Sequence, residues 1–352
     1  MSDSRPPHPW DMSEVSVVIL GAGFSYAATD GQMPLMSNYF ADIDVSQFSQ
    51  LCEFINAVAD DMRTANVETV LLALDQIRTS PKSVLSGWAE EWHSQQAELN
   101  LQLTQYTLAR LSVSLVYETD NWAANVLAQC GPNTTVISMN YDNLAERILS
   151  NRKGIVHHGP DRNCPHCRMR DLLQHACSCV GKHEINDEAW RGALIKPHGS
   201  VAWRRCINAS CCNYECLVAD GRCRPFQPCN CPNCEHPCSP VMVMPTMSKN
   251  LNDVPEIGVM WQATRHALAD AESILIFGFS LPNSDELLTQ MIRNSIHCQK
   301  RLKRLGVIDL DPEAVIDRFK RCVPGECDVY ATPFAVSGTQ PPDWLLNRTD
   351  AM

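Results

Sequence analysis

Short apolar runs alternate with helical patterns along most of the chain, and each run ends at a glycine or polar turn. Residues 15–20 are a β-branched run that enters a glycine turn, and residues 134–138 run into Asn140-Tyr141-Asp142. Such runs are typical of buried strands, and the periodicity between them is typical of helices. Further strands are expected at 193–196, 241–244, 273–277 and 306–309, with helices at 144–149, 261–268 and 285–292. Alternating units of this kind predict an α/β fold with a Rossmann-like, doubly wound parallel sheet.

One long segment departs from this alternation. Residues 42–130 show helical periodicity, and Asn66 is placed to cap a helix with Val67, Val70 and Leu71 on one side. We therefore expect a helical insertion within a single domain that spans residues 15–336. Residues 1–14 and 337–352 are expected to form polar tails.

Composition limits where the protein works. The start of the chain has neither the basic residues nor the apolar core of a signal peptide. Its longest apolar runs fall far short of the ~20 residues that span a bilayer. We expect a soluble, cytoplasmic protein without membrane contact.

Cysteines are the strongest chemical signal. Thirteen of the 18 lie in residues 151–239, a span with few long apolar runs, interrupted by an expected core strand at 193–200. In a chain of this size without a signal peptide, cysteines more often bind metal than form disulfides. We interpret residues 151–239 as a zinc module that metal ions must stabilise.

The spacing predicts about two structural zinc ions. In one site, Cys231 and Cys234 form a CxxC knuckle, and Cys206 with Cys211 or Cys212 completes four thiolates. The second set is Cys164, Cys167, Cys177 and Cys179, with His175 or His183 as alternative ligands. Closed four-ligand sites leave no position for a reacting water, so both are expected to be structural. Free buried thiols are the alternative.

Charge argues against nucleic acid as the main partner. The formal net charge is −11, which repels phosphate backbones. The zinc module has 12 basic and 8 acidic residues, but each four-thiolate zinc carries a charge of about −2 that offsets this excess. Nucleic-acid binding at the module is therefore only a secondary hypothesis.

Polar residues follow several of the expected strands, at the sheet edge where open α/β sheets bind ligands. A glycine turn of residues 21–25 lets backbone approach a pyrophosphate, although the third glycine of the usual fingerprint is missing. The other turns carry Asn140 and Asp142; His198; Gly278 and Ser280, with Asp285 nearby; and Asp309. Taken singly, the aspartates could cap helices and His198 could bond a loop. Their occurrence at successive strand ends favours a dinucleotide site.

These motifs together resemble the sirtuin superfamily over residues 15–325. The residues that carry the resemblance are Gly21-Ala22-Gly23-Phe24-Ser25, Asn140-Tyr141-Asp142, His198-Gly199-Ser200 followed by cysteines, and Gly278-Phe279-Ser280. Residues 31–35, 66–71 and 245–249 are similar to the sirtuin-like proteins of prokaryotic antiviral defence. The resemblance to that subgroup implies an NAD hydrolase that releases nicotinamide and ADP-ribose.

The departures from protein deacylases are informative. Pro34-Leu35-Met36 stands where deacylase sirtuins have Asp-Phe-Arg, and no Phe-Gly-Glu peptide clamp follows the zinc module. Asp309 replaces a frequent asparagine but can still accept hydrogen bonds from the adenosine ribose. A protein deacylase or ADP-ribosyltransferase is one alternative function. A non-catalytic nucleotide sensor or zinc-mediated binding module is another.

The resemblance assigns roles residue by residue. Asn140 is expected to orient water, His198 to act as the base, and Asp142 to hold nicotinamide or its loop. NAD is expected to bind at Gly21, Ala22, Gly23, Phe24, Ser25, Pro34, Gly278, Ser280, Asp285 and Asp309. We expect no effector domain of obvious size after residue 325, and we therefore expect activation by a partner protein or by self-assembly.

Overall fold

The computed structural model describes most of the α/β core, the helical segment and part of the cysteine-rich region. The described residues are 10–79, 88–111, 121–131, 133–150, 156–157, 193–211, 217–219, 230–231, 234–243, 255–281, 286–299, 301–320, 322–323, 327–334 and 345–346. The expected ligand Asp285 and the second cysteine set, Cys164 to Cys179, lie outside them.

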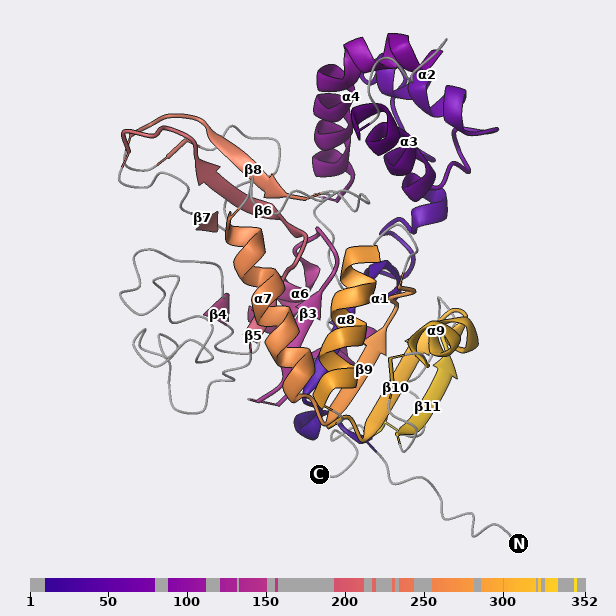
Figure 1. Ribbon diagram of the computed structural model, residues 1–352, viewed down its shortest axis with the longest axis vertical. Helices are drawn as coiled ribbons and strands as arrows, with labels where there is room; N and C mark the ends of the chain where they lie inside the picture. Colours follow the sequence, from indigo (N-terminus) through magenta and orange to yellow (C-terminus); the bar gives the residue numbers. More distant parts are fainter. Residues whose placement is uncertain are drawn as a thin grey trace, which may run out of the picture.

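A seven-stranded sheet forms the centre of the molecule, and all of its neighbouring strands pair in parallel (Figure 1). Its order is β11-β10-β9-β2-β3-β5-β4. The bounds are β2 Val17–Leu20, β3 Thr135–Ser138, β4 Val156–His157, β5 Ala193–Ile195, β9 Ser273–Phe277, β10 Arg304–Asp309 and β11 Asp328–Pro333. Strands β2 and β9 are buried at every position, as expected for a sheet covered on both faces.

Helices cover both faces of this sheet. One apolar core contains residues of α7 Pro255–Asp270, α8 Glu286–Gln299 and α9 Pro312–Phe319. The core of the other face contains residues of α1 Ala22–Ala28, α5 Trp122–Ala128 and α6 Leu144–Ser150. The prediction of a Rossmann-like, doubly wound parallel sheet is confirmed.

The strand order reverses between β2 and β9. From β2 the chain builds β3, β4 and β5 on one side, then crosses to β9, β10 and β11 on the other. Loops that leave β2 and β9 therefore diverge at their carboxyl ends and open a crevice, which is where doubly wound sheets bind ligands.

Three helices form a lobe with its own core: α2 Ser49–Val58, α3 Val67–Thr79 and α4 Trp88–Leu111. The lobe lies beyond the carboxyl ends of the strands (Figure 1). Asn66 begins α3 as expected, because its Oδ1 accepts a hydrogen bond from the amide of Glu68 at 2.8 Å. The lobe is shorter than the expected 42–130 insertion, since α5 packs against α1 and α6 in the sheet layer.

After β5 the chain leaves the parallel sheet and forms an antiparallel arm. Its strands are β6 Gly199–Cys206, β7 Leu217–Ala219 and β8 Cys238–Met242, in the order β7-β6-β8. The strand expected at 241–244 is therefore wrong in its bounds, and it pairs with β6 instead of joining the parallel sheet. An apolar run shows that a strand is buried but does not reveal its partner.

The ends of the described chain are more ordered than the expected tails. Trp10 and Met12 are almost fully buried, and β1 Trp10–Asp11 pairs in parallel with β12 Leu345–Leu346. Two short 3-10 helices, Met12–Glu14 and Met36–Asn38, complete the elements. No helix in the described ranges is both long and apolar enough to cross a membrane.

Candidate functional site

A cavity of about 480 Å³ opens at the carboxyl ends of the parallel strands, next to the helical lobe. This volume is within the range of small-molecule sites. Of the residues expected to act on or bind a ligand, those that line it are Gly21, Ala22, Gly23, Ser25, Pro34, Asn140, Asp142, His198, Gly278, Ser280 and Asp309. Residues from distant parts of the sequence thus meet around one cavity, at the reversal of strand order.

The glycine turns form the floor of the cavity by packing backbone against backbone. The amide of Gly21 donates to the carbonyl of Phe277 at 3.0 Å, and that of Gly23 donates to the carbonyl of Gly278 at 2.9 Å. A Cβ on Gly278, whose φ is +62°, would lie 2.1 Å from the amide nitrogen of Phe24. These two glycine amides are therefore committed to the neighbouring turn, and the glycines are needed for its close approach.

Phe24 differs from its neighbours in the glycine turn. Its side chain is fully buried, its ring meets that of Phe277 edge to face at 5.1 Å, and it is not among the residues that line the cavity. The structure therefore places the Phe24 side chain in the apolar core, where it packs α1 against β9.

Asn140 follows β3 and is held by two hydrogen bonds. Its Nδ2 donates to the carbonyl of Gly21 and to Oγ of Ser25, each at 2.8 Å. Both amide protons are therefore used by the protein, and the remaining hydrogen-bonding atom of the side chain is the acceptor Oδ1. An acceptor at a cavity wall can orient a water or a sugar hydroxyl.

Asp142 is buried beneath Asn140. Its Oδ2 accepts a hydrogen bond from Oγ of Ser25 at 2.8 Å, and its Oδ1 accepts from the amide of Leu144 at 2.9 Å. Burial raises the pKa of this carboxyl, and the Lys196 ammonium opposes the rise. Asp142 therefore bonds the first amide of α6, in line with the helix-capping role considered from the sequence, and it also orients Ser25.

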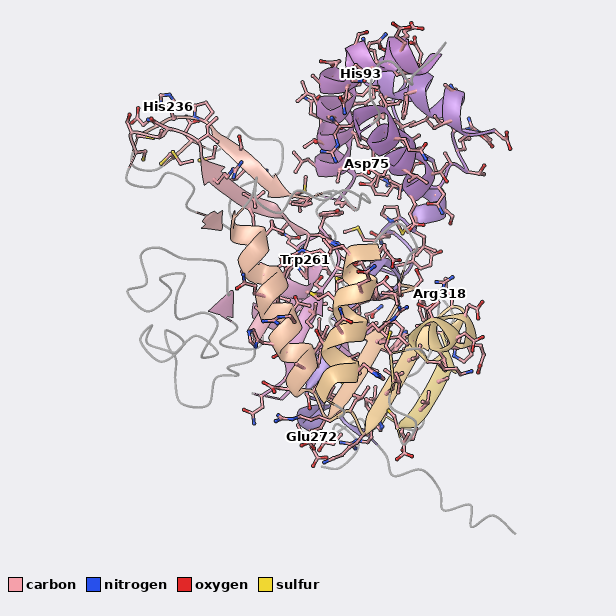
Figure 2. The ribbon with its side chains drawn as sticks, viewed as in Figure 1. Asp75, His93, His236, Trp261, Glu272 and Arg318 are labelled. Atoms are coloured by element: carbon pink, nitrogen blue, oxygen red, sulfur yellow. The ribbon has the colours of Figure 1, made fainter. Side chains whose placement is uncertain are left out.

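His198 lies in the turn between β5 and β6 and is only 5% exposed. Its Nδ1 is 3.3 Å from the carbonyl of Met139, which can only accept, so Nδ1 carries the proton of the neutral ring. Nε2 is then the basic nitrogen. The turn is held from α7, because Nε1 of Trp261 donates to the carbonyl of Pro197 at 2.9 Å, and Trp261 is marked in Figure 2.

Two charged side chains, Asp309 and Arg318, also line the cavity. Asp309 ends β10, and burial raises the pKa of its carboxyl. Arg318 of α9, marked in Figure 2, donates to the carbonyl of Ser280 and also lines the cavity. Nothing in the sequence marks Arg318 as a cavity residue, because α9 is an ordinary amphipathic helix and its approach to the turn after β9 is a tertiary contact.

The lobe supplies the opposite wall. Asn66, Val67, Glu68 and Leu71 of the α3 start line the cavity, together with Leu111 at the end of α4. The sequence indicated residues 66–71 as a helix start and through the family resemblance, but not as the wall of a cavity. Leu111 carried no signal, because nothing local distinguishes it from other core leucines.

Four cysteines meet in the arm, close to the end marked by His236 in Figure 2. The sulfur atoms of Cys206, Cys211, Cys231 and Cys234 all lie within 4.8 Å of one another. Cys206 lies 3.6 Å from Cys234, and Cys211 lies 3.7 Å from Cys231, sulfur to sulfur. Four converging thiols fit the tetrahedral preference of zinc, so this set could hold one ion. Of the two alternative ligands, Cys211 joins the cluster, and Cys212 lies outside the described residues.

Comparisons with known proteins give only distant similarity. No family model matches the chain, and no curated protein matches it. A crystal structure of SIR2 in complex with the inhibitor EX-527, 2'-O-acetyl-ADP-ribose and a deacetylated p53 peptide is similar, with 13% identity and a TM-score of 0.38 over 90% of this chain and 87% of that one. A structure described as showing the structural basis of sirtuin substrate affinity has 14% identity and a TM-score of 0.33, over 90% and 88%. Similarity at this level does not assign an activity.

Proposed function

We propose that the cavity binds NAD and that the protein hydrolyses its nicotinamide–ribose bond, releasing nicotinamide and ADP-ribose. The observation that carries the proposal is the meeting of Asn140 and His198 in one cavity with both glycine turns and Asp309. The cavity lies at the reversal of strand order, where this sheet architecture takes dinucleotides. The motifs shared with sirtuins support NAD as the particular dinucleotide.

The proposed orientation follows from the chemistry of the walls. Asp309 at the end of β10 can accept hydrogen bonds from the adenosine ribose hydroxyls. The pyrophosphate then crosses the turns that follow β2 and β9, and Arg318 offers a positive charge near them. This leaves the nicotinamide end beside Asn140 and His198.

Cleavage of the glycosidic bond builds positive charge on the ribose, as in other reactions that pass through an oxocarbenium-like state. Asn140 can hold the attacking water through Oδ1. Nε2 of His198 can accept a proton from that water or from a ribose hydroxyl. The C–N bond breaks with its electron pair leaving on nicotinamide, and the water oxygen forms the new bond to the ribose carbon.

We propose hydrolysis rather than transfer to an acyl-lysine peptide because the peptide-clamping motif is missing. In its place, the segment after β8 is tied down by Tyr141, whose Oη donates to the carbonyl of Val243 at 2.7 Å. A cytoplasmic role in antiviral defence, with activation by a partner protein or by self-assembly, is proposed from the motif resemblance alone. That role is tested by comparing the survival of phage-challenged cells that carry the wild-type protein with that of cells that carry Asn140→Ala or His198→Ala.

Product analysis tests the activity directly. Purified protein is incubated with NAD, alone and with candidate activators, in the presence and absence of an acetylated peptide, and products are separated by mass spectrometry. We expect nicotinamide and ADP-ribose in equal amounts, independent of the peptide. Acetyl-ADP-ribose formed faster than ADP-ribose would instead support a deacylase, and intact NAD under every condition would contradict the proposed function.

A further inference from the structure

A fully buried lysine lies behind the proposed reaction site. Lys196 follows β5 directly, and its side chain is 0% exposed. Its ammonium donates to the carbonyl of Asp142, to Oε1 of Glu146 at 2.7 Å and to Oγ of Ser200 at 3.1 Å. A buried ammonium is costly unless all its protons are bonded, and here all three are.

The partners of Lys196 belong to three different elements. Asp142 lies in the loop after β3, Glu146 in α6 and Ser200 at the start of β6. Lys196 therefore joins the loop that carries Asn140 to the turn that carries His198, from the side away from the cavity. It is not among the residues that line the cavity, and none of its three hydrogen bonds is to Asn140.

A chain of hydrogen bonds connects this lysine to the amide of Asn140. The ammonium holds the backbone of Asp142, and the carboxylate of Asp142 accepts from Oγ of Ser25. Because the Ser25 proton is directed at Asp142, the Ser25 oxygen is left to accept from Nδ2 of Asn140. With the second Nδ2 proton on Gly21, the direction of the amide is fully determined. Within the described residues, no hydrogen bond engages Oδ1 of Asn140.

The charge state of Asp142 determines whether this series of hydrogen bonds keeps its direction. Burial raises the pKa of the Asp142 carboxyl; among the charged groups, Lys196 opposes this rise and Glu146 of α6 adds to it. A protonated Asp142 would become a donor, and the Ser25 proton and the Asn140 amide would then lose their fixed direction.

We propose that Lys196 is a positioning residue of the reaction, which fixes the Asn140 amide with Oδ1 toward the cavity by holding the Asp142 loop and its charge. The kinetic part of this inference rests on the proposed function. The competing explanation is that Lys196 and Glu146 form an ordinary structural ion pair, whose loss would affect folding alone.

Lys196→Met keeps the side-chain length and removes the charge. We expect kcat for NAD cleavage to fall about 10²-fold with KM little changed, because misplacement of a reacting group affects the chemical step. In ¹⁵N-labelled protein, the side-chain amide protons of Asn140, assigned by their absence in Asn140→Asp, should be protected from exchange in the wild type and unprotected in Lys196→Met. This second readout does not depend on activity.

The double variant Lys196→Met/Glu146→Gln separates positioning from folding. Removing both charges leaves no unpaired buried carboxylate at Glu146, so melting temperature should recover relative to Lys196→Met. We expect kcat and Asn140 protection to stay low. Ile292→Ala, a core change in α8 outside the cavity, is the control for stability loss and should leave both readouts unchanged.

The outcomes are distinct. Wild-type kcat in either folded Lys196 variant, or a protected Asn140 amide in both, overturns the positioning role. If Lys196→Met does not fold, the double variant decides by the same two measurements. If wild-type protein leaves NAD intact, the proposed function fails, while loss of Asn140 protection on removing Lys196 still supports the positioning role.

Discussion

At the scale of single residues, the two polar side chains of the candidate site are held through different atoms. Asn140 has both amide protons bonded to the protein, whereas His198 has its Nδ1 bonded to the carbonyl of Met139. Each side chain therefore presents an acceptor, Oδ1 in one case and Nε2 in the other. Two acceptors at one cavity suit the binding and deprotonation of a water or hydroxyl.

Removing either acceptor should stop the reaction without unfolding the protein. We expect His198→Ala and Asn140→Ala each to lower NAD turnover by about 10²–10⁴-fold, the usual effect of losing an acid–base group. Each should change stability by only about 1–2 kcal/mol, since few hydrogen bonds are lost. Turnover and melting temperature are measured together. Near-normal turnover in either variant would remove that residue from the reaction.

Most residues of the candidate site could be identified from the sequence, but the contacts that hold them in place could not. Asn140 and His198 follow strand ends, and this position alone indicated a shared edge. The sequence suggested a pyrophosphate as the reason for the glycines, and the structure adds a second reason, because Gly21 and Gly23 pack against Gly278. Nothing local in the sequence reveals a contact between turns so far apart. The relay from Lys196 to Asn140 was hidden for the same reason.

At the scale of elements, the antiparallel arm depends on its cysteines. Strand β6 begins beside His198 and ends at Cys206, so the arm links the candidate site to the four-cysteine cluster. Few apolar side chains of the described part of the arm are buried; Val201, Trp203 and Val241 are the main ones. The described residues of the arm therefore have little apolar packing, and a metal ion held by the four cysteines would stabilise them further.

Zinc should be bound at the described cluster and lost when its knuckle is removed. We expect the double variant Cys231→Ser/Cys234→Ser to lose about one equivalent of zinc and to melt lower, because structural zinc contributes directly to folding. Zinc content is measured by atomic emission and stability by calorimetry. Cys238→Ser changes a thiol of β8 outside the cluster and should retain the ion.

Unchanged zinc content and stability in the double variant would exclude Cys231 and Cys234 as zinc ligands. A second equivalent of zinc in the wild-type protein would support the cluster proposed at Cys164 to Cys179.

Elements were predicted well where the local pattern suffices. Strand β9 matches its expected bounds, and β2, β3 and β10 differ by two residues or fewer at each end. The run at 241–244 was assigned to the wrong sheet, because period and polarity do not specify a strand's partner. The helix α5 was counted with the insertion for a similar reason: its helical pattern is clear, but its packing against α1 and α6 is tertiary.

At the scale of the whole molecule, one cavity is assembled from three parts. The parallel sheet supplies the turns after β2, β3, β5, β9 and β10, the lobe supplies the wall at α3, and α9 supplies Arg318. A ligand that fills the cavity therefore joins the lobe to the sheet, and binding should stabilise the folded protein as a unit.

ADP-ribose should raise the stability of the protein, because it fills the proposed adenosine and pyrophosphate regions without being cleaved. At 100 times its Kd, a ligand that binds only the folded state stabilises it by about 2.7 kcal/mol. Calorimetry over a range of ADP-ribose concentrations measures this shift and gives the Kd.

Asp309→Ala should weaken binding by roughly 10- to 100-fold, since a hydrogen bond to a charged group contributes about 1.5–3 kcal/mol. Asp317→Ala is the matched control, because Asp317 lies on the exposed side of α9, pairs with Lys320 and does not line the cavity. If both variants bind ADP-ribose as the wild type does, the adenosine end is not at Asp309, and the orientation proposed for NAD is wrong.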